Sequence, residues 1–443
     1  MRDIFVVLVV FGTLPFIFKR PYIGILLWCW LGYMNPHKLS WNFAHDFPFA
    51  QITALTILMS LLISKDEKKI PHTRETVILM VFIGWMLITT LFSMYPDLAW
   101  QQWDKVWKIQ LMTFVTIIIM NKKEYIHWMV WIIALSLGFY GFKGGIFTIS
   151  TGGGYAVYGP SGTFIYGNNE IGLALIMTIP LIRYLQLNTE NFWIKRGLMA
   201  TMLLCIVSII GTQSRGALVG LCAMGLVFVF KSRNKTSLLM ILSVVLTLTI
   251  SFMPDSWHSR MATIGDEQVD DSVQGRFNAW WMAFNLAKSQ ILGGGFESFQ
   301  RPSFWLYAPE PGRVHDAHSI YFEVLGEHGF IGLFLFLLLG LFSLKSCSKI
   351  IKQTKNIAEL KWMRDLAAML QVSLIGYAAS GAFLGLAYFD LYYNLVAIVV
   401  ICRKLLNDAL AEKKEMTELV PATKVSSPSL GQVRGRRDKS PNF

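Results

Sequence analysis

The residues best suited to chemistry lie in one short stretch, residues 313–319, where a long polar segment meets an apolar block. This stretch reads RVHDAHS and contains Arg313, His315, Asp316 and His318. Imidazole titrates near neutral pH, so a neutral His318 can take a proton from a hydroxyl group. The positive dipole end of a helix that starts there would favour this neutral form. We therefore predict that His318 acts as a general base and that Arg313 and His315 contact the substrate.

Other interpretations of the same stretch remain open. A histidine at a membrane edge is often only an amphipathic side chain with a hydrogen-bond partner, and His315 suits that role. The pair His315 and His318, beside Asp316, could also hold a metal ion. No third strong ligand follows at helical spacing, so we expect neither a metal nor another cofactor.

Arg215 and Arg276 stand where helices are expected to begin. Arg215 occurs in GTQSRGALVG, between two apolar blocks, and Arg276 occurs in QGRFNAWW. A guanidinium group beside the free N–H groups of a helix start is well suited to phosphate. Each arginine also has a structural interpretation, because Arg215 could reach the lipid headgroups along its own stem and Arg276 could be solvated. Diphosphate needs more than one cation, so we predict that both arginines bind a diphosphate.

The composition indicates an all-α membrane protein. Apolar residues make up 54% of the chain and charged residues 15%, and the apolar residues occur in long blocks. Such blocks cross the bilayer as helices, because lipid leaves only helices and closed barrels as spanning structures. We expect about 12 crossings, or 13, from apolar blocks at residues 4–18, 21–34, 49–64, 76–95, 100–120, 126–149, 169–187, 196–211, 215–231, 236–253, 318–344, 365–388 and 391–406.

The distribution of charge predicts the orientation of the chain. The net charge of +12 comes largely from Lys and Arg clusters between apolar blocks. These clusters follow the positive-inside rule, which argues against a nucleic-acid partner and places their connections in the cytoplasm. They lie at residues 65–69, 122–123, 195–196, 231–235 and 345–364. The connections at 35–48, 150–168, 213–215 and 254–317 then face outward, and the five cysteines, all in or beside apolar blocks, imply no disulfide framework.

Four parts are expected along the chain. Membrane helices occupy residues 1–253, a large exported segment follows at 254–317, more membrane helices occupy 318–406, and a disordered cytoplasmic tail occupies 407–443. The exported segment should contain an amphipathic helix over residues 274–290, which ends before the three glycines at 293–295.

Two details refine this division. Pro302, Pro309 and Pro311 argue against regular structure between that helix and His315. The run 327–329, Glu-His-Gly, is expected to be a packing position or a break in the following membrane helix, and a buried pairing role is favoured for it.

The motif around His318 resembles the signature of the O-antigen ligase and polymerase superfamily. The matching residues are His318, Ser319, Tyr321, Phe322, Leu325, Glu327, Gly329 and Gly332. Ser214-Arg215-Gly216 is similar to the Ser-Arg-Gly element of that family, and the region from Gly275-Arg276 to Phe299 is similar to its arginine-containing exported loop. The opening of the chain, at 21–22 and 33–37, resembles the subgroup of exosortase-associated O-glycosylation ligases.

The resemblance implies a metal-independent glycosyltransferase of the GT-C type on the periplasmic face of the bacterial inner membrane. Its donor would be a glycan on undecaprenyl diphosphate, and its acceptor a hydroxyl group of lipid A–core oligosaccharide. His318 would activate the acceptor, while Arg215 and Arg276 would hold the donor diphosphate. Direct attack would invert the anomeric carbon. The expected partners are these two substrates and membrane lipids, and the enzyme is expected to be a monomer.

Other functions share part of this pattern. The O-antigen polymerase and the protein O-oligosaccharyltransferase of the same superfamily carry the same motifs, so the acceptor rests on the subgroup resemblance alone. An exporter or flippase of lipid-linked glycan is the alternative from another class. It would place charges at mid-membrane depth and show internal pseudosymmetry, whereas the charges here gather at one surface. A non-catalytic scaffold would keep glycan transfer intact after His318→Ala.

Overall fold

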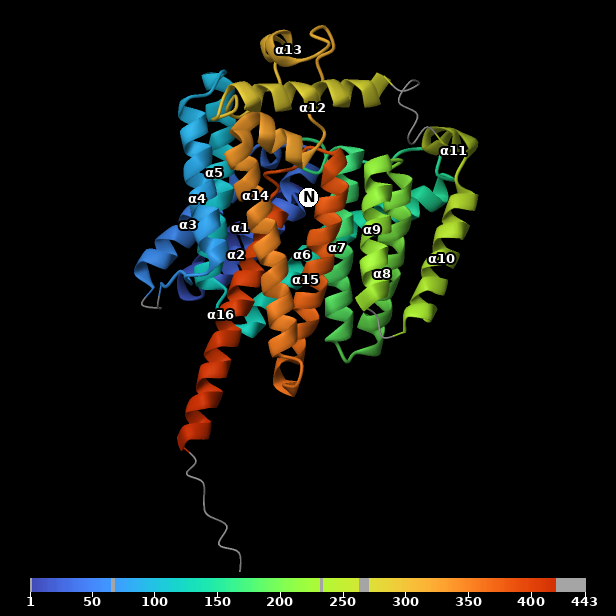
Figure 1. Cartoon of the computed structure of the whole chain (residues 1–443). Coiled ribbons are helices and arrows are strands. Elements are labelled where there is room, and N and C mark those ends of the chain that lie inside the picture. The colour runs from blue at the N-terminus through green and yellow to red at the C-terminus, as the bar shows by residue number, and fades with distance from the viewer. Residues whose placement is uncertain (1, 65–67, 232–233, 263–270, 420–443) are drawn as a thin grey trace, which may run out of the picture. The chain divides into compact units, whose positions relative to one another are not determined.

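The computed structural model describes residues 2–64, 68–231, 234–262 and 271–419, and these residues form helices and no strands. Every apolar block predicted from the sequence overlaps with one helix (Figure 1). These helices are α1 Arg2–Lys19, α2 Pro21–Tyr33, α3 Phe49–Ile63, α4 Arg74–Leu91, α5 Pro96–Ile119, α6 Lys123–Ser150, α7 Asn168–Leu187, α8 Phe192–Gly211, α9 Arg215–Lys231, α10 Lys235–Phe252, α14 Ile320–Gln353, α15 Lys361–Ser380 and α16 Asp390–Leu419.

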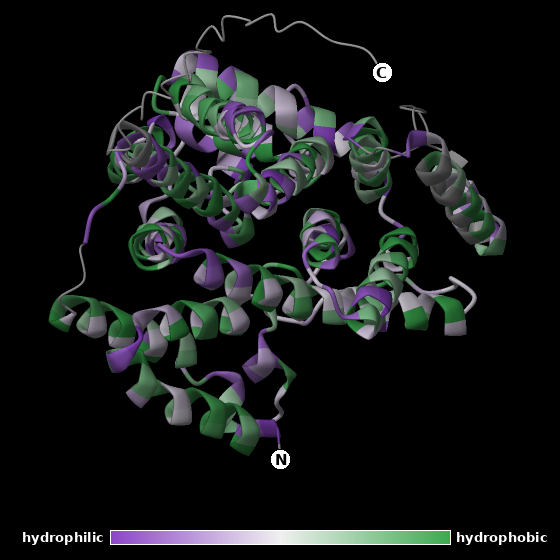
Figure 2. Cartoon of the chain, turned by 90° about the horizontal axis from the view of Figure 1, so that it is seen from below, coloured by the Kyte–Doolittle hydropathy of each residue, from purple (hydrophilic) through white to green (hydrophobic). Residues whose placement is uncertain are grey.

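Six helices within the described ranges are long and apolar enough to cross a membrane, namely α4, α6, α7, α8, α14 and the region around α15. Two shorter apolar helices, α2 and α3, accompany them. Large apolar side chains are exposed on the outer helices, including Leu8, Leu62 and Leu91, and apolar residues run along the helices when they are viewed end-on (Figure 2). The chain is therefore a multi-pass membrane protein, and the total of 12 or 13 crossings stays a prediction.

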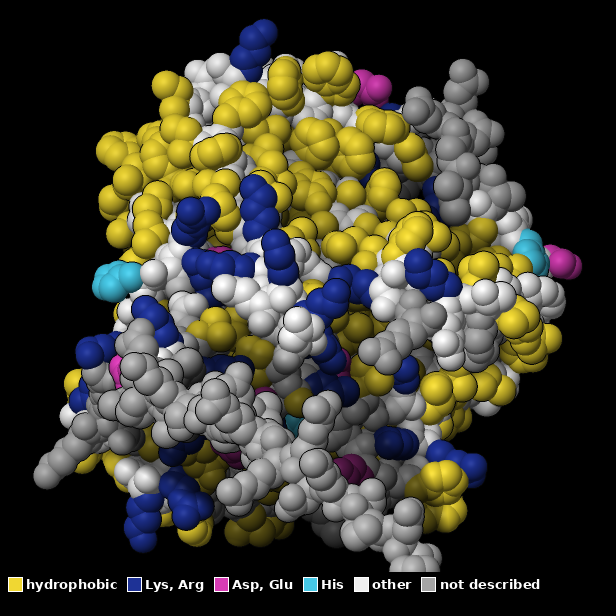
Figure 3. All heavy atoms as spheres, turned by 60° about the horizontal axis from the view of Figure 1, so that its bottom comes forward, with side chains coloured by type: hydrophobic (Ala, Val, Ile, Leu, Met, Phe, Trp, Pro, Cys, Tyr) yellow, Lys and Arg dark blue, Asp and Glu magenta, His cyan; other side chains and the backbone are white. Residues whose placement is uncertain are grey.

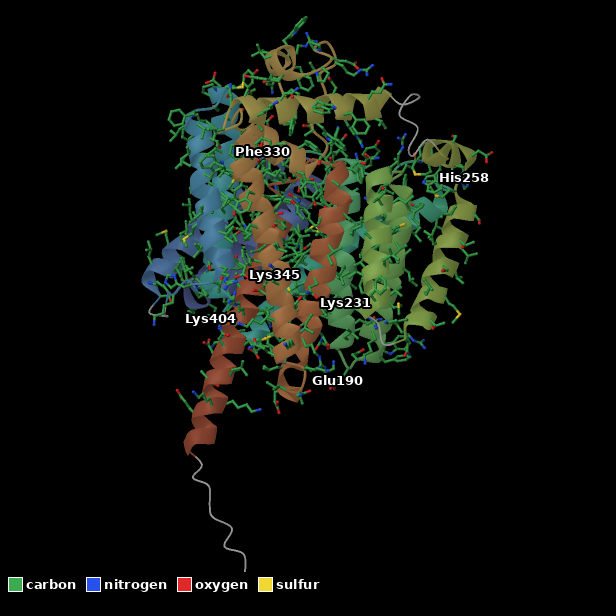
Figure 4. The ribbon with its side chains drawn as sticks, in the orientation of Figure 1. Glu190, Lys231, His258, Phe330, Lys345 and Lys404 are labelled. Atoms are coloured by element: carbon green, nitrogen blue, oxygen red, sulfur yellow. The ribbon has the colours of Figure 1, made fainter. Side chains whose placement is uncertain are left out.

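Successive long helices run in opposite directions, so their connections collect at two ends of residues 1–405. We call one the α12 end, because α12, Asp271–Ser289, lies across it (Figure 1). The other is the basic end, toward which Lys231, Lys345 and Lys404 lie (Figure 4). Lys and Arg side chains gather over this face of the molecule (Figure 3), while Lys65 to Glu67 and Ser232–Arg233 lie outside the described residues.

The connections expected to face outward meet at the α12 end. The Gly294 carbonyl accepts a hydrogen bond of 2.8 Å from the Met94 N–H, which joins the α4–α5 connection to the segment after α12. The Gln213 amide donates to the Gly153 carbonyl at 3.1 Å, which joins the α6–α7 and α8–α9 connections. The structure therefore places all the polar connections that the sequence analysis singled out at one end.

The amphipathic helix predicted over residues 274–290 is confirmed as α12, although it starts earlier. Its buried face carries Ala279, Met282 and Leu286, which pack with Phe304. Phe304 belongs to a short helix, α13 Arg301–Tyr307, so the expected irregular structure after α12 is wrong there. Pro302 is compatible with this helix because it lies in the first turn, where the backbone N–H has no helical partner.

The predicted break in α14 is confirmed at Gly329, which has a φ of 65° and a ψ of −171°. A break frees backbone carbonyls, and buried carbonyls need donors. The turn after α12 supplies two of them, because Gly294 donates to the Gly326 carbonyl at 2.9 Å and Gly295 donates to the Glu327 carbonyl at 2.8 Å. The Trp85 indole of α4 donates to the His328 carbonyl at 2.9 Å. The exported segment is thus hydrogen-bonded into a membrane helix.

The end of the chain forms a separate unit, residues 406–443. Residues 407–419 continue helix α16, where the sequence analysis expected a tail without regular structure. Residues 420–443 of that predicted tail lie outside the described residues.

Candidate active site

His318 lies at the α12 end, between the exported segment and the start of α14. Its φ of 41° is left-handed, a backbone conformation that residues other than glycine rarely adopt. The neighbouring backbone is held by α12, since the Trp280 indole donates to the Ala317 carbonyl at 2.8 Å. The Trp280 ring also stacks on Phe322 of α14, with ring centroids 4.8 Å apart. His318 therefore has a strained backbone, as is common at functional sites, and its neighbours on both sides contact α12.

The His318 imidazole is kept neutral by its surroundings. Its side chain is 28% exposed, and Nδ1 lies 4.0 Å from Oδ2 of Asp316, too far for a hydrogen bond. Burial lowers the pKa of His318 below its ordinary value of 6.5, and the positive charge of Arg276 and the His315 ring lower it further, while Asp316 opposes the shift. At neutral pH the imidazole can therefore accept a proton.

Acidic side chains surround Asp316. A methyl group placed on Gly385 would lie 3.5 Å from Oδ2 of Asp316 and 3.3 Å from Oε2 of Glu323, so these two carboxylates face the same glycine. Asp316 also interacts electrostatically with Glu170, at the start of α7, and with Glu297. Burial, followed by the charge of Asp316, raises the pKa of Glu297. The site is therefore rich in groups that can accept hydrogen bonds from hydroxyl groups or carry protons.

Arg276 adds a positive charge to this cluster, since its charge acts on both His318 and Glu170. It projects from α12, which begins at Asp271, so it lies in the second turn and not at the helix start that the sequence analysis expected. The helix dipole acts mainly within the first turn. Any anion at Arg276 would therefore be bound by the guanidinium group and not by the end of α12.

Arg215 does lie at a helix start, as predicted, because it is the first residue of α9. The Ser214 hydroxyl accepts a hydrogen bond of 3.1 Å from the Ala217 N–H and lies 2.5 Å from Oδ1 of Asn169, which ties α9 to α7. A short helix, η4 Gly381–Phe383, packs between the start of α9 and the start of α14. A methyl group placed on Gly216 would lie 2.9 Å from Phe383, and one placed on Gly381 would lie 2.5 Å from Ile320.

Arg313 and His315 occupy different positions within the exported segment. The Arg313 guanidinium donates to Oε1 of Gln274 at 2.7 Å and pairs with Glu310 at 3.2 Å, so these contacts anchor the connection to α12. The His315 ring lies against the backbone of Gly275, where a methyl group would approach it to 2.5 Å. Its centroid is 5.4 Å from that of His318. His315 thus lies between α12 and the predicted base.

Glu297 is the site residue that sequence reasoning missed. It follows the glycine turn after α12, has a φ of 60°, and donates its backbone N–H to Oε1 of Glu327 at 2.8 Å. Oε2 of Glu327 accepts a hydrogen bond of 2.5 Å from the Tyr388 hydroxyl, in agreement with the buried pairing expected for Glu327. No motif or periodicity distinguishes Glu297, because its position depends on the break in α14.

Strained backbone also marks the α12 end. Four residues other than glycine have a positive φ in the described part of the chain: Asn35, Gln213, Glu297 and His318. All four lie in connections at this end. Across the described ranges, no three His, Cys, Asp or Glu side chains lie close enough together to hold a metal ion.

Two family comparisons cover most of the chain. Residues 1–190 match a family of unknown function, DUF5935, and residues 200–337 match the O-antigen ligase family. No curated protein matches the sequence significantly. The second match runs from α8 into α14 and contains Arg215, Arg276 and His318. The chain therefore carries an O-antigen ligase domain at residues 200–337, which supports its assignment to the O-antigen ligase and polymerase superfamily.

Proposed function

We propose that this protein is an O-antigen ligase, which transfers a glycan from undecaprenyl diphosphate to a hydroxyl group of lipid A–core oligosaccharide. The observation that carries the proposal is the position of His318. It lies within the O-antigen ligase match, in a strained conformation, with a lowered pKa and with Arg276 close enough to act on it electrostatically.

The reaction follows from these groups. His318 takes the proton of the acceptor hydroxyl, the oxygen attacks the anomeric carbon, and the bond between that carbon and the diphosphate oxygen breaks. Arg276 and Arg215 bind the diphosphate, which leaves with its negative charge, and His318 then releases the proton to solvent. A single displacement inverts the anomeric carbon. Neither a metal ion nor another cofactor takes part in this scheme, which is that of a GT-C glycosyltransferase.

The orientation follows from the positive-inside rule. The basic end faces the cytoplasm, and the α12 end, with His318, faces the periplasm. The protein lies in the bacterial inner membrane as a monomer with 12 or 13 crossings, and its C-terminus is cytoplasmic. Both substrates are amphiphiles of that membrane, so they reach the α12 end from the lipid.

The decisive experiment is glycan transfer by the purified protein, with undecaprenyl-diphosphate glycan as donor, lipid A–core as acceptor and EDTA present. His318→Ala should lower the rate by about 100- to 10,000-fold, the range for loss of a general base. His258→Ala is the control, because His258 is exposed on α11, Asp255–Ala262, within the same exported segment (Figure 4).

Other outcomes would redirect the proposal. Lengthening of the donor glycan by the wild type would identify a polymerase, and labelling of a protein would identify a protein O-oligosaccharyltransferase. Absence of transfer to any acceptor, together with movement of lipid-linked glycan across vesicles, would identify an exporter. Equal transfer by the wild type and His318→Ala would contradict the role of His318.

A further inference from the structure

A pocket of about 400 Å³ lies at the α12 end, on the side of α2 and α5. Its polar lining comes from segments far apart in the sequence: Asn35, His37, Lys38, Lys105, Thr163 and Asp390. The volume is within the range of small-molecule binding sites. Nothing in the reaction scheme above uses these residues.

The charges of the lining favour an anion. Lys38 and Lys105 contribute two positive charges, against one carboxylate from Asp390. The Lys38 ammonium lies 3.1 Å from Oδ1 of Asp46, whose side chain is 84% exposed, so solvent weakens this ion pair. Burial, followed by the charge of Lys38, lowers the pKa of His37 to about 4, so His37 adds a neutral ring. Its Nδ1 is buried and has no hydrogen-bond partner among the described residues.

Electrostatic interactions connect the pocket to the candidate active site. Lys105 interacts electrostatically with Glu297, Glu297 interacts with Asp316, and Asp316 acts on His318. The backbone gives a second connection, because Phe389 and Asp390 line the pocket directly after Tyr388, whose hydroxyl donates to Glu327. We therefore infer that a glycan of several sugar units, with its reacting end at His318, extends toward this pocket.

We propose that the pocket binds an anionic sugar unit, phosphorylated or carboxylated, of one of the two glycan substrates. The ammonium groups of Lys38 and Lys105 would bind the phosphate or carboxylate, and Asn35, Thr163 and Asp390 would exchange hydrogen bonds with the sugar hydroxyls. The assignment of this sugar to a substrate rests on the proposed function. The binding of an anionic sugar does not, so the two can be tested separately.

Binding is measured on the full-length purified protein by ligand-observed NMR, with glucose 6-phosphate, glucuronate and glucose as probes. The two anionic probes should bind more tightly than glucose. Lys105→Gln should weaken them about tenfold, the effect of losing one charge-assisted hydrogen bond, and Lys105→Arg should retain binding. Lys349→Gln, at an exposed lysine near the basic end of α14, is the matched control and should change nothing. Equal affinity for glucose, or unchanged binding by Lys105→Gln, would overturn the proposal.

Kinetics then identify the source of the sugar. In the transfer assay, Lys105→Gln should raise KM for the acceptor or for the donor glycan, and the substrate affected is the one that occupies the pocket. An unchanged KM for both substrates would refute the proposal even if the probes bind. A wild-type protein that binds anionic sugars but transfers no glycan would instead contradict the proposed function and leave the pocket assignment standing.

Discussion

His318 joins two properties that are independent of each other, a left-handed backbone and a pKa below 6.5. Because the reaction needs the neutral imidazole, a lowered pKa extends activity toward acid. We expect kcat/KM to be constant through neutral pH and to fall only below pH 6.5, as His318 becomes protonated. A pH profile of glycan transfer tests this, and an acidic limb centred above 6.5 would contradict it.

The charges around His318 predict how the acidic limb of the pH profile moves in variants. Asp316 stabilises the protonated imidazole, so Asp316→Asn should move the limb to lower pH. Arg276 opposes protonation, so Arg276→Gln should move it to higher pH. Lys288→Gln, at an exposed residue in the last turn of the same helix, should leave the profile unchanged. A shift of both variants in one direction would refute the assignment of the limb to His318.

The proposed binding of the donor diphosphate by Arg276 has its own kinetic consequence. A guanidinium group that binds the donor makes charge-assisted hydrogen bonds, so Arg276→Gln should raise KM for the donor by about tenfold or more. The comparison with Lys288→Gln separates this effect from a general change in charge on α12. An unchanged donor KM, with a raised acceptor KM, would move Arg276 from the donor to the acceptor.

At the scale of elements, the glycine turn after α12 packs against the break in α14 and stabilises it. Gly293 has a φ of 69°, and a methyl group there would lie 2.6 Å from the Gly329 nitrogen. Gly293→Ala should therefore destabilise the protein by about 1–3 kcal/mol and lower its melting temperature. Gly312→Ala, in the same exported segment, meets nothing within 4 Å and should have little effect. Equal melting temperatures for both variants would show that the turn tolerates a side chain.

Trp280 is expected to position His318 rather than to touch substrate. Trp280→Phe removes the hydrogen bond to the Ala317 carbonyl and keeps an aromatic ring against Phe322. We expect kcat to fall about fivefold, the consequence of losing a hydrogen bond of roughly 1 kcal/mol near the reacting group, with both KM values nearly unchanged. Trp281→Phe is the control, since Trp281 is 55% exposed. A higher KM without a loss of kcat would indicate that Trp280 binds substrate directly.

At the scale of the whole molecule, the separation of polar connections from basic clusters predicts which end is accessible from outside the cell. Gly312→Cys and Lys349→Cys can be made in a Cys222→Ala background, which removes the exposed native thiol. An impermeant maleimide should label Gly312→Cys in spheroplasts, and Lys349→Cys only after the membrane is opened. The reverse pattern would invert the proposed topology.

The sequence by itself determined the helices and predicted their orientation. Each apolar block became one helix, because lipid requires backbone groups to be satisfied within the segment, and block length is a local property. The sequence also singled out His318, Arg215 and Arg276 as candidate site residues, since each stands at a recognisable edge between polar and apolar residues. The early start of α12 and the short helix α13 were missed, because the ends of helices depend on caps and neighbours.

The tertiary structure alone decided which connections meet. Glu297 approaches Asp316 because the glycine turn fills the break in α14, and Lys105 and Lys38 share a pocket because α5 and the segment after α2 pack beside the start of α16. These contacts join residues far apart in the chain. Periodicity reports which face of one helix is apolar, but it does not specify which other helix covers that face. Motifs could therefore identify the predicted base, whereas the groups around it were visible only in the folded chain.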